Sequence, residues 1–167
     1  MIPRRQRSRW TMVAPDLGRA PVAEKWADDL KIDLVVIDKR RAADGSVKTG
    51  STNAFPELDG RNCVVVDDMV DTAGTLISGL EVLSGSGADR IVVAATHAPL
   101  SGPAVKRIKK SPIDTLVVMN TVPTADAEQL LRDQLRILDV SPIIGSAIGQ
   151  IVTKGSISAM FKGEDRS

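Results

Sequence analysis

The sequence predicts an α/β protein with a doubly wound, mainly parallel sheet and helices on both faces. Short runs of aliphatic and β-branched residues alternate with stretches of helical periodicity along the chain. Aromatic residues make up only 2% of the sequence, so an aliphatic core is expected, as in sheets that are buried on both faces. No repeat, low-complexity segment or linker divides the 167 residues, a length that suits one domain.

Each predicted strand is a short apolar run that ends at a turn or a polar cluster. The expected strands are residues 11–14, 34–37, 62–66, 91–95, 115–119 and 135–139, with an edge strand at 157–161. Apolar residues at helical spacing predict helices at 21–30, 75–84, 101–110, 125–132 and 141–153. In the first helix Trp26 is expected to face the core, and Cys63 is expected to be a small buried residue.

Composition and charge argue against several classes of protein. The net charge is +1, whereas a nucleic-acid-binding protein usually carries a clear basic excess. No apolar run approaches the roughly 20 residues that cross a membrane. A single cysteine rules out an internal disulfide and fits a reducing, cytoplasmic setting. Residues 1–10 are expected to be a basic, disordered tail, and residues 11–167 a single domain.

The most informative stretch is residues 64–75, where a valine-rich strand leads through acidic residues to a polar loop and a helix. Residues 72–75 combine backbone amides at a helix start, two hydroxyls and a glycine, which together predict a cradle for an anion. Asp67 and Asp68 suit the hydroxyls of a sugar or a hard divalent cation held through water. A phosphate on the loop and two hydroxyls on the acids describe a ribose 5-phosphate.

Three other interpretations share these residue types. Residues 67–71 spell the DDxxD of isoprenoid synthases, but that motif lies on a helix, and here it follows a strand. A strand that ends in two acids is also typical of P-loop NTPases, but the P-loop lysine and first glycine are missing. An acidic loop without a ligand is the third alternative. The specific order of residues in the nine-residue stretch 67–75 argues against it.

Polar clusters follow four of the predicted strands. They are Pro15-Asp16, residues 38–41, residues 67–75 and Thr96-His97. Because ligands of such sheets bind beyond the carboxyl ends of the strands, we expect these clusters to share one rim.

Five stretches, in order, resemble motifs of the ribose-phosphate pyrophosphokinases (PRPP synthetases), which have the type I phosphoribosyltransferase fold. The similarity runs in register from about residue 11 to 161. The stretches are 13–18 (similar to VSPDxGG), 37–41 (the catalytic-loop start), 65–75 (VDDMxDTxGT), 96–104 (THGxFSGPA) and 117–123 (VVTNTIP).

The resemblance implies transfer of diphosphate from ATP to the 1-hydroxyl of ribose 5-phosphate in nucleotide biosynthesis, with Mg²⁺ as cofactor. It implies that the 5-phosphate is held by Asp71, Thr72, Ala73, Gly74 and Thr75, and the ribose hydroxyls by Asp67 and Asp68. Asp16 would help to bind magnesium. Lys39 and Arg41 match the two basic residues that stabilise the transition state, where positioning and positive charge do most of the work.

The sequence also departs from the family pattern. The match covers only the C-terminal half of a synthetase, and the half with most adenine-binding residues and a metal-binding histidine is not matched. His97, the only histidine, falls in a different motif and is expected to be structural or close to the site. Arg19 stands in place of a glycine, Val22 in place of a basic residue and Ala98 in place of the glycine of THG.

Three hypotheses remain open from the sequence. The chain is a PRPP synthetase-family polypeptide whose upstream half is encoded separately or missing from the gene model. Alternatively it is a non-catalytic, regulatory paralogue that binds a ribose phosphate. The third hypothesis is a phosphoribosyltransferase that uses PRPP; the lack of a recognisable hood segment for a base argues against it. As partners we expect ribose 5-phosphate or PRPP, ATP with its adenine site on another chain or absent, and a homo-oligomer, but no nucleic acid or membrane.

Overall fold

A computed structural model describes residues 4–37 and 58–160. The strands are β1 (Trp10–Ala14), β2 (Asp33–Val36), β3 (Asn62–Met69), β4 (Arg90–His97), β5 (Thr115–Met119) and β6 (Leu135–Leu138). The α-helices are α1 (Ala20–Leu30), α2 (Gly74–Gly85), α3 (Ala104–Lys110), α4 (Ala125–Leu131) and α5 (Ser141–Val152). Short 3₁₀ helices are η1 (Arg4–Arg9), η3 (Arg132–Gln134) and η4 (Ile157–Met160). None of the described helices is long and apolar enough to span a membrane.

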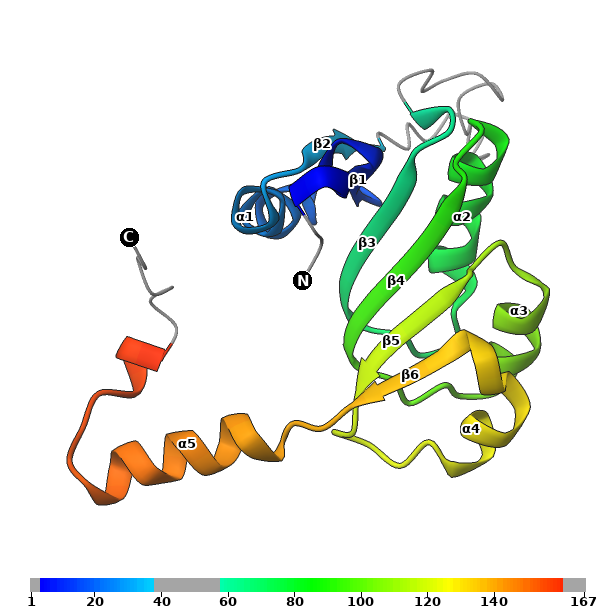
Figure 1. The fold of residues 1–167 in the computed structure, drawn as a ribbon. Coiled ribbons are helices and arrows are strands. Elements are labelled where there is room, and N and C mark those ends of the chain that lie inside the picture. The colour runs from blue at the N-terminus through cyan, green and yellow to red at the C-terminus, as the bar shows by residue number, and fades with distance from the viewer. Residues whose placement is uncertain (1–3, 38–57, 161–167) are drawn as a thin grey trace.

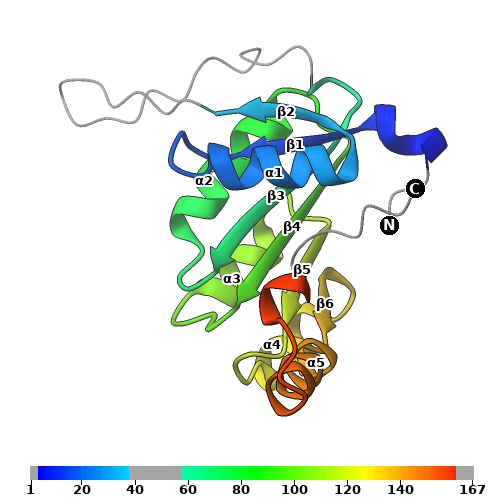
Figure 2. The ribbon, with the colours of Figure 1, turned by 90° about the vertical axis from the view of Figure 1, so that its left-hand side faces the viewer.

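The six strands form one sheet in the order β2-β1-β3-β4-β5-β6, and each neighbouring pair is parallel. From β1 the chain steps outward to β2, and from β3 it steps in the opposite direction to β6. Because parallel crossovers are right-handed, opposite steps place their helices on opposite faces of the sheet. Accordingly, α2, α3 and α4 lie on one face and α1 on the other (Figures 1 and 2). The predicted α/β, doubly wound fold is confirmed.

The core has two parts, one on each side of the sheet. Successive strand residues point to opposite faces, so Met12 packs under α1 with Ala23 and Ala27, whereas Val13 joins the larger cluster under α2–α4. The fully buried members of this larger cluster include Leu80 and Leu83 of α2. Cys63 is completely buried, as predicted.

Several elements differ from the sequence-based prediction. β3 continues past Val66 to Met69 because its pairing with β4 extends to Met69 opposite His97. Residues 157–160 form η4 rather than an edge strand, since α5 carries this segment away from the sheet (Figure 1). Within the expected disordered tail, residues 4–9 form η1, where Arg9 approaches Asp89 at 3.6 Å.

Trp26 is not a core residue. Its side chain is 47% exposed, because α1 covers only the part of its sheet face near β1 and β2 (Figure 2). The small residues Ala23 and Ala27 make the buried contact of the helix instead.

Candidate functional site

The candidate site lies at the carboxyl ends of β1, β3 and β4. β1 and β3 are neighbours in the sheet, and the chain leaves them in opposite directions. Such a switch point opens a crevice for ligands in doubly wound sheets. Asp16 follows β1, Asp67 and Asp68 end β3, and His97 ends β4. Residues 38–41, which follow β2 in the sequence, lie outside the described residues, so Lys39 and Arg41 are not placed.

The loop from β3 to α2 is fixed at its base. The amide of Val70 donates to the carbonyl of His97 at 2.9 Å, and the amide of Leu100 donates to the carbonyl of Val70 at 3.3 Å. Val70 is buried, while Asp71, Thr72 and Thr75 are exposed at the rim. The loop therefore presents its polar side chains to solvent from a buried apolar anchor.

Ala73 closes this loop in the left-handed conformation, with a φ of 59°, immediately before α2 begins at Gly74. Its carbonyl accepts the first helical hydrogen bond, from the amide of Ile77 at 3.1 Å. The first amides of a helix lack partners within it, so they can bind an anion together with the positive end of the helix dipole.

Arg107 braces the loop from α3. Its Nη1 atom donates to the carbonyl of Thr72 at 2.8 Å, and it lies 3.4 Å from where a Cβ on Gly74 would be. The guanidinium adds a positive charge beside the first residues of α2. Sequence reasoning did not identify this residue, because four basic residues share this part of α3 and no local pattern separates Arg107 from the others.

Arg19 joins the two acidic residues of β3. Its Nη2 atom lies 2.6 Å from Asp68 Oδ1 and 2.9 Å from Asp67 Oδ1, and its backbone amide donates to Asp16 Oδ1 at 3.0 Å. Arg19 therefore brings together the three carboxylates that the sequence assigned to the sugar and the metal. In the sequence, Arg19 differs from the family pattern only in that it replaces a glycine, which does not indicate its contacts with the acids.

The pKa values of Asp67 and Asp68 are shifted in opposite directions. Burial raises the pKa of Asp67, and the hydrogen bond from the Asp68 amide (2.9 Å) and the charge of Arg19 oppose that shift. The hydrogen bond from Arg19 lowers the pKa of Asp68, and the same bond raises the pKa of Arg19. Asp68 is thus the carboxylate that stays ionised most readily at this end of the site.

His97 is held at the end of β4 by a threonine. Its Nδ1 atom lies 2.9 Å from Thr121 Oγ1, and that hydroxyl donates to the carbonyl of Thr96 at 3.0 Å. Since the hydroxyl proton is committed to Thr96, Nδ1 carries the ring proton and donates to Thr121. This hydrogen bond fixes the orientation of the ring beside the loop.

The described residues contain no group of three or more His, Cys, Asp or Glu side chains that could hold a metal ion. Mg²⁺ seldom needs such a cage, because one or two carboxylates usually hold it together with substrate phosphates and water. Asp16 is exposed at the end of β1 and carries an oxygen-donor carboxylate of the required kind. The donor set at this rim therefore fits a magnesium ion that arrives with phosphates.

Comparison with known proteins adds to this geometry. Residues 52–162 match the model of the phosphoribosyl synthetase-associated domain family. The chain is 38% identical over 155 residues to a ribose-phosphate pyrophosphokinase of Streptomyces coelicolor, covering 93% of this chain and 47% of that protein. The corresponding Streptomyces avermitilis protein is 37% identical, with the same coverage.

A solved structure shows a similar arrangement. The phosphoribosylpyrophosphate synthetase of Mycobacterium smegmatis superposes with a TM-score of 0.75 and 34% identity, over 89% of this chain and 46% of that one. This chain thus spans about half the length of the relatives that it matches.

Proposed function

Because this chain belongs to the phosphoribosyl synthetase-associated domain family, we propose that it binds ribose 5-phosphate or PRPP at the rim between β1 and β3. The observation that carries the proposal is the placement of Asp67 and Asp68 directly before the loop 71–75, at the switch point of the sheet. The loop, the start of α2 and Arg107 supply the positive end for the 5-phosphate. The two carboxylates accept hydrogen bonds from the ribose hydroxyls.

The proposed reaction is the transfer of diphosphate from ATP to ribose 5-phosphate. The 1-hydroxyl oxygen attacks the β-phosphorus of ATP and its proton leaves to solvent. The bond between the β-phosphorus and the oxygen that bridges it to the α-phosphorus breaks, so AMP leaves with that oxygen. The protein has mainly to position both substrates and to stabilise negative charge. We assign the charge stabilisation to Lys39 and Arg41, by resemblance to the family.

Magnesium, when bound, would neutralise charge on the phosphate oxygens, and Asp16 is the residue proposed to contact it. The residues of this rim are assigned to the ribose phosphate, and no adenine site is assigned to them. We further propose a homo-oligomer in the cytoplasm, with no nucleic-acid or membrane partner.

A bound sugar would compete with Arg19 for the two acids. Its guanidinium occupies the Oδ1 atoms of both Asp67 and Asp68. About a third of the Arg19 side chain is exposed (34%), so solvent reaches it and the exchange of partners is feasible. Ligand binding then replaces an ion pair that contributes little, because solvent screens it at the exposed Asp68 carboxylate.

The test combines an activity assay with direct binding. The purified chain is mixed with ATP, ribose 5-phosphate and Mg²⁺, and AMP is measured. AMP that depends on ribose 5-phosphate supports the full proposal. Calorimetric binding of ribose 5-phosphate without AMP supports the site but assigns the chain to a non-catalytic binding role. Absence of both would overturn the proposal.

A further inference from the structure

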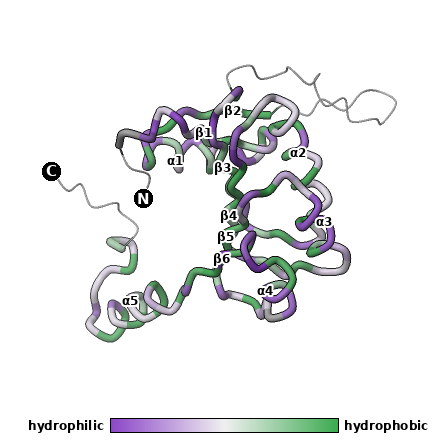
Figure 3. Tube along the Cα trace, turned by 45° about the vertical axis from the view of Figure 1, so that its right-hand side comes forward, coloured by the Kyte–Doolittle hydropathy of each residue, from purple (hydrophilic) through white to green (hydrophobic). Residues whose placement is uncertain are grey.

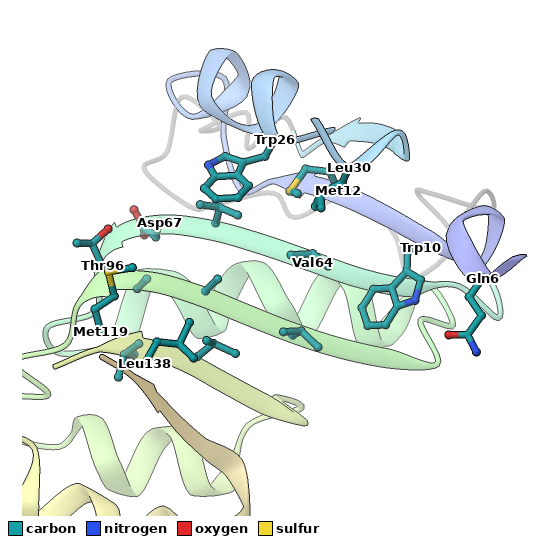
Figure 4. Close-up of a pocket in the computed structure, with 16 residues that line it drawn as sticks. Gln6, Trp10, Met12, Trp26, Leu30, Val64, Asp67, Thr96, Met119 and Leu138 are labelled. Atoms are coloured by element: carbon teal, nitrogen blue, oxygen red, sulfur yellow. The ribbon is translucent and has the colours of Figure 1, made fainter. Parts of the chain in front are cut away.

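The sheet face opposite α2–α4 is open over β3 to β6 and forms an apolar groove of about 570 Å³. Its floor consists of outward-facing aliphatic residues of the strands, and Trp26 and Leu30 of α1 form one wall (Figure 4). Asp67 and Thr96 lie at one end of the groove, and Trp10 and Gln6 at the other. Asp67 is the one charged side chain among the described residues that line it. The floor residues are Val64, Val66, Val92, Ala94, Val117 and Met119.

Helix α5 carries the complementary surface. None of the twelve residues from Ser141 to Val152 is charged, and none is buried. Ile144, Ile148 and Ile151 recur at helical spacing and are 51%, 54% and 62% exposed. Ser146 lies on the opposite side of the helix by the same spacing. Figure 3 shows this helix extended away from the sheet, so its apolar face has no cover from the sheet of its own chain.

The joint between β6 and α5 holds the helix in this outward direction. Asp139 Oδ1 accepts from the Ser141 hydroxyl at 2.7 Å, the Ser141 amide at 2.9 Å and Asn120 Nδ2 at 3.0 Å. Asn120 Oδ1 accepts from the Val140 amide at 2.9 Å. These bonds tie the first residues of α5 to the end of β5. The helix is therefore directed away from the groove of its own chain.

We propose that α5 of one copy lies in the groove of a second copy, and that the second copy returns its own α5 in exchange. Both surfaces belong to one chain, so a single two-fold axis covers both helices and both grooves at once. The sizes agree: twelve helical residues span about 18 Å, and the distance across four strands is about 14 Å. An uncharged helix and an aliphatic floor also match in polarity, and sheets of this type are normally covered on both faces.

The exchange predicts a dimer with apolar contacts. In size-exclusion chromatography with light scattering, the full chain should have twice the 17.8 kDa mass of one copy. The dimer should persist at high salt, because screening does not weaken apolar contacts. A wild-type chain that stays at 17.8 kDa up to high protein concentration would overturn the proposal and assign the groove to a different polypeptide.

Two variants test the two halves of the contact. Ile148→Glu puts a charge on α5, and Leu138→Glu puts one at the edge of the groove; both positions are at least half exposed (54% and 50%), so the fold should tolerate them. Each should weaken the dimer by about 100-fold or more, since each contact then buries a carboxylate. Ser146→Glu, on the other side of α5, is the matched control and should remain dimeric. Circular dichroism checks that all three are folded.

Mixing the two charged variants distinguishes exchange from other dimers. The Leu138→Glu chain keeps an intact α5 and the Ile148→Glu chain keeps an intact groove, so the mixture can form one undamaged contact. A tagged Ile148→Glu chain should therefore capture the Leu138→Glu chain, while neither variant captures itself. A dimer that only one variant dissociates, or a mixture without capture, would contradict the exchange.

Discussion

At the scale of single residues, Arg19 decides the charge at the sugar end of the site. It pairs with Asp67 and Asp68 at 2.9 and 2.6 Å, in the space where the ribose hydroxyls are proposed to bind. The polar residues of the loop 71–75, which is proposed to hold the phosphate, stay exposed while Arg19 occupies the two acids proposed to hold the sugar. On the proposed function, the ligand therefore competes with Arg19 for the two acids.

Removing that competitor should tighten ligand binding. Arg19→Gly should raise the affinity for ribose 5-phosphate by about two- to fivefold, the equivalent of an exposed ion pair. Glycine is an accepted residue at a helix N-cap, and Arg19 makes no side-chain capping hydrogen bond to α1 that the change would remove. Arg19→Lys, which keeps the charge, should fall between the two in calorimetry. Weaker binding of the glycine variant would mean that Arg19 contacts the ligand rather than competes with it.

Cys63 is a second residue with a clear expectation. Burial raises the pKa of its thiol to about 11, and its side chain is inaccessible to solvent. At pH 8 the native protein should react with a thiol reagent at least about 100-fold more slowly than the denatured chain, because the thiolate is the reactive form. A spectrophotometric assay with an aromatic disulfide measures both rates. Rapid modification of the folded protein would contradict this burial.

At the scale of elements, the loop before α2 depends on the backbone of Ala73. A left-handed φ costs a residue with a side chain about 1–2 kcal/mol, and a β-branched residue is especially unfavourable there. Ala73→Val should lower the free energy of unfolding by about 2 kcal/mol and weaken phosphate binding. Ala73→Gly should be close to neutral, because relief of strain offsets the greater entropy of the unfolded chain. Denaturant unfolding measures both, and a valine variant as stable as the native chain would refute the loop geometry.

The joint before α5 should respond to acid. Hydrogen bonds, first that from the Ser141 hydroxyl, lower the pKa of Asp139 in the folded state. The anchoring they provide is therefore complete above the ordinary aspartate pKa of about 3.9 and is lost as the pH falls through the lower, folded pKa. In an NMR titration the Ser141 amide should shift with a midpoint below about 3.9. Asp139→Asn should abolish the shift, and a higher midpoint in the native chain would argue against the joint.

At the scale of the whole molecule, the sequence predicted the features that local patterns encode. The strands, the acidic end of β3 and the loop to α2 are contiguous in the sequence, and the rim follows from parallel strand order. The contacts of Arg19 with Asp68 and of Arg107 with Thr72 were not predictable, because they join residues 49 and 35 positions apart. Trp26 was assigned to the core because helical periodicity does not show how much of a sheet face one helix covers.

The central claim is that Asp67, Asp68 and the loop 71–75 bind ribose 5-phosphate. Calorimetric titration of the wild-type chain and of Asp68→Asn with ribose 5-phosphate tests it most directly, with Asp133→Asn as a matched control at an exposed position away from the rim. We expect binding to the wild-type and control proteins. In the Asp68 variant we expect the affinity to fall by at least about tenfold, since hydrogen bonds to a charged group are stronger than those to a neutral one. Equal affinity of all three proteins would contradict the placement of the sugar site.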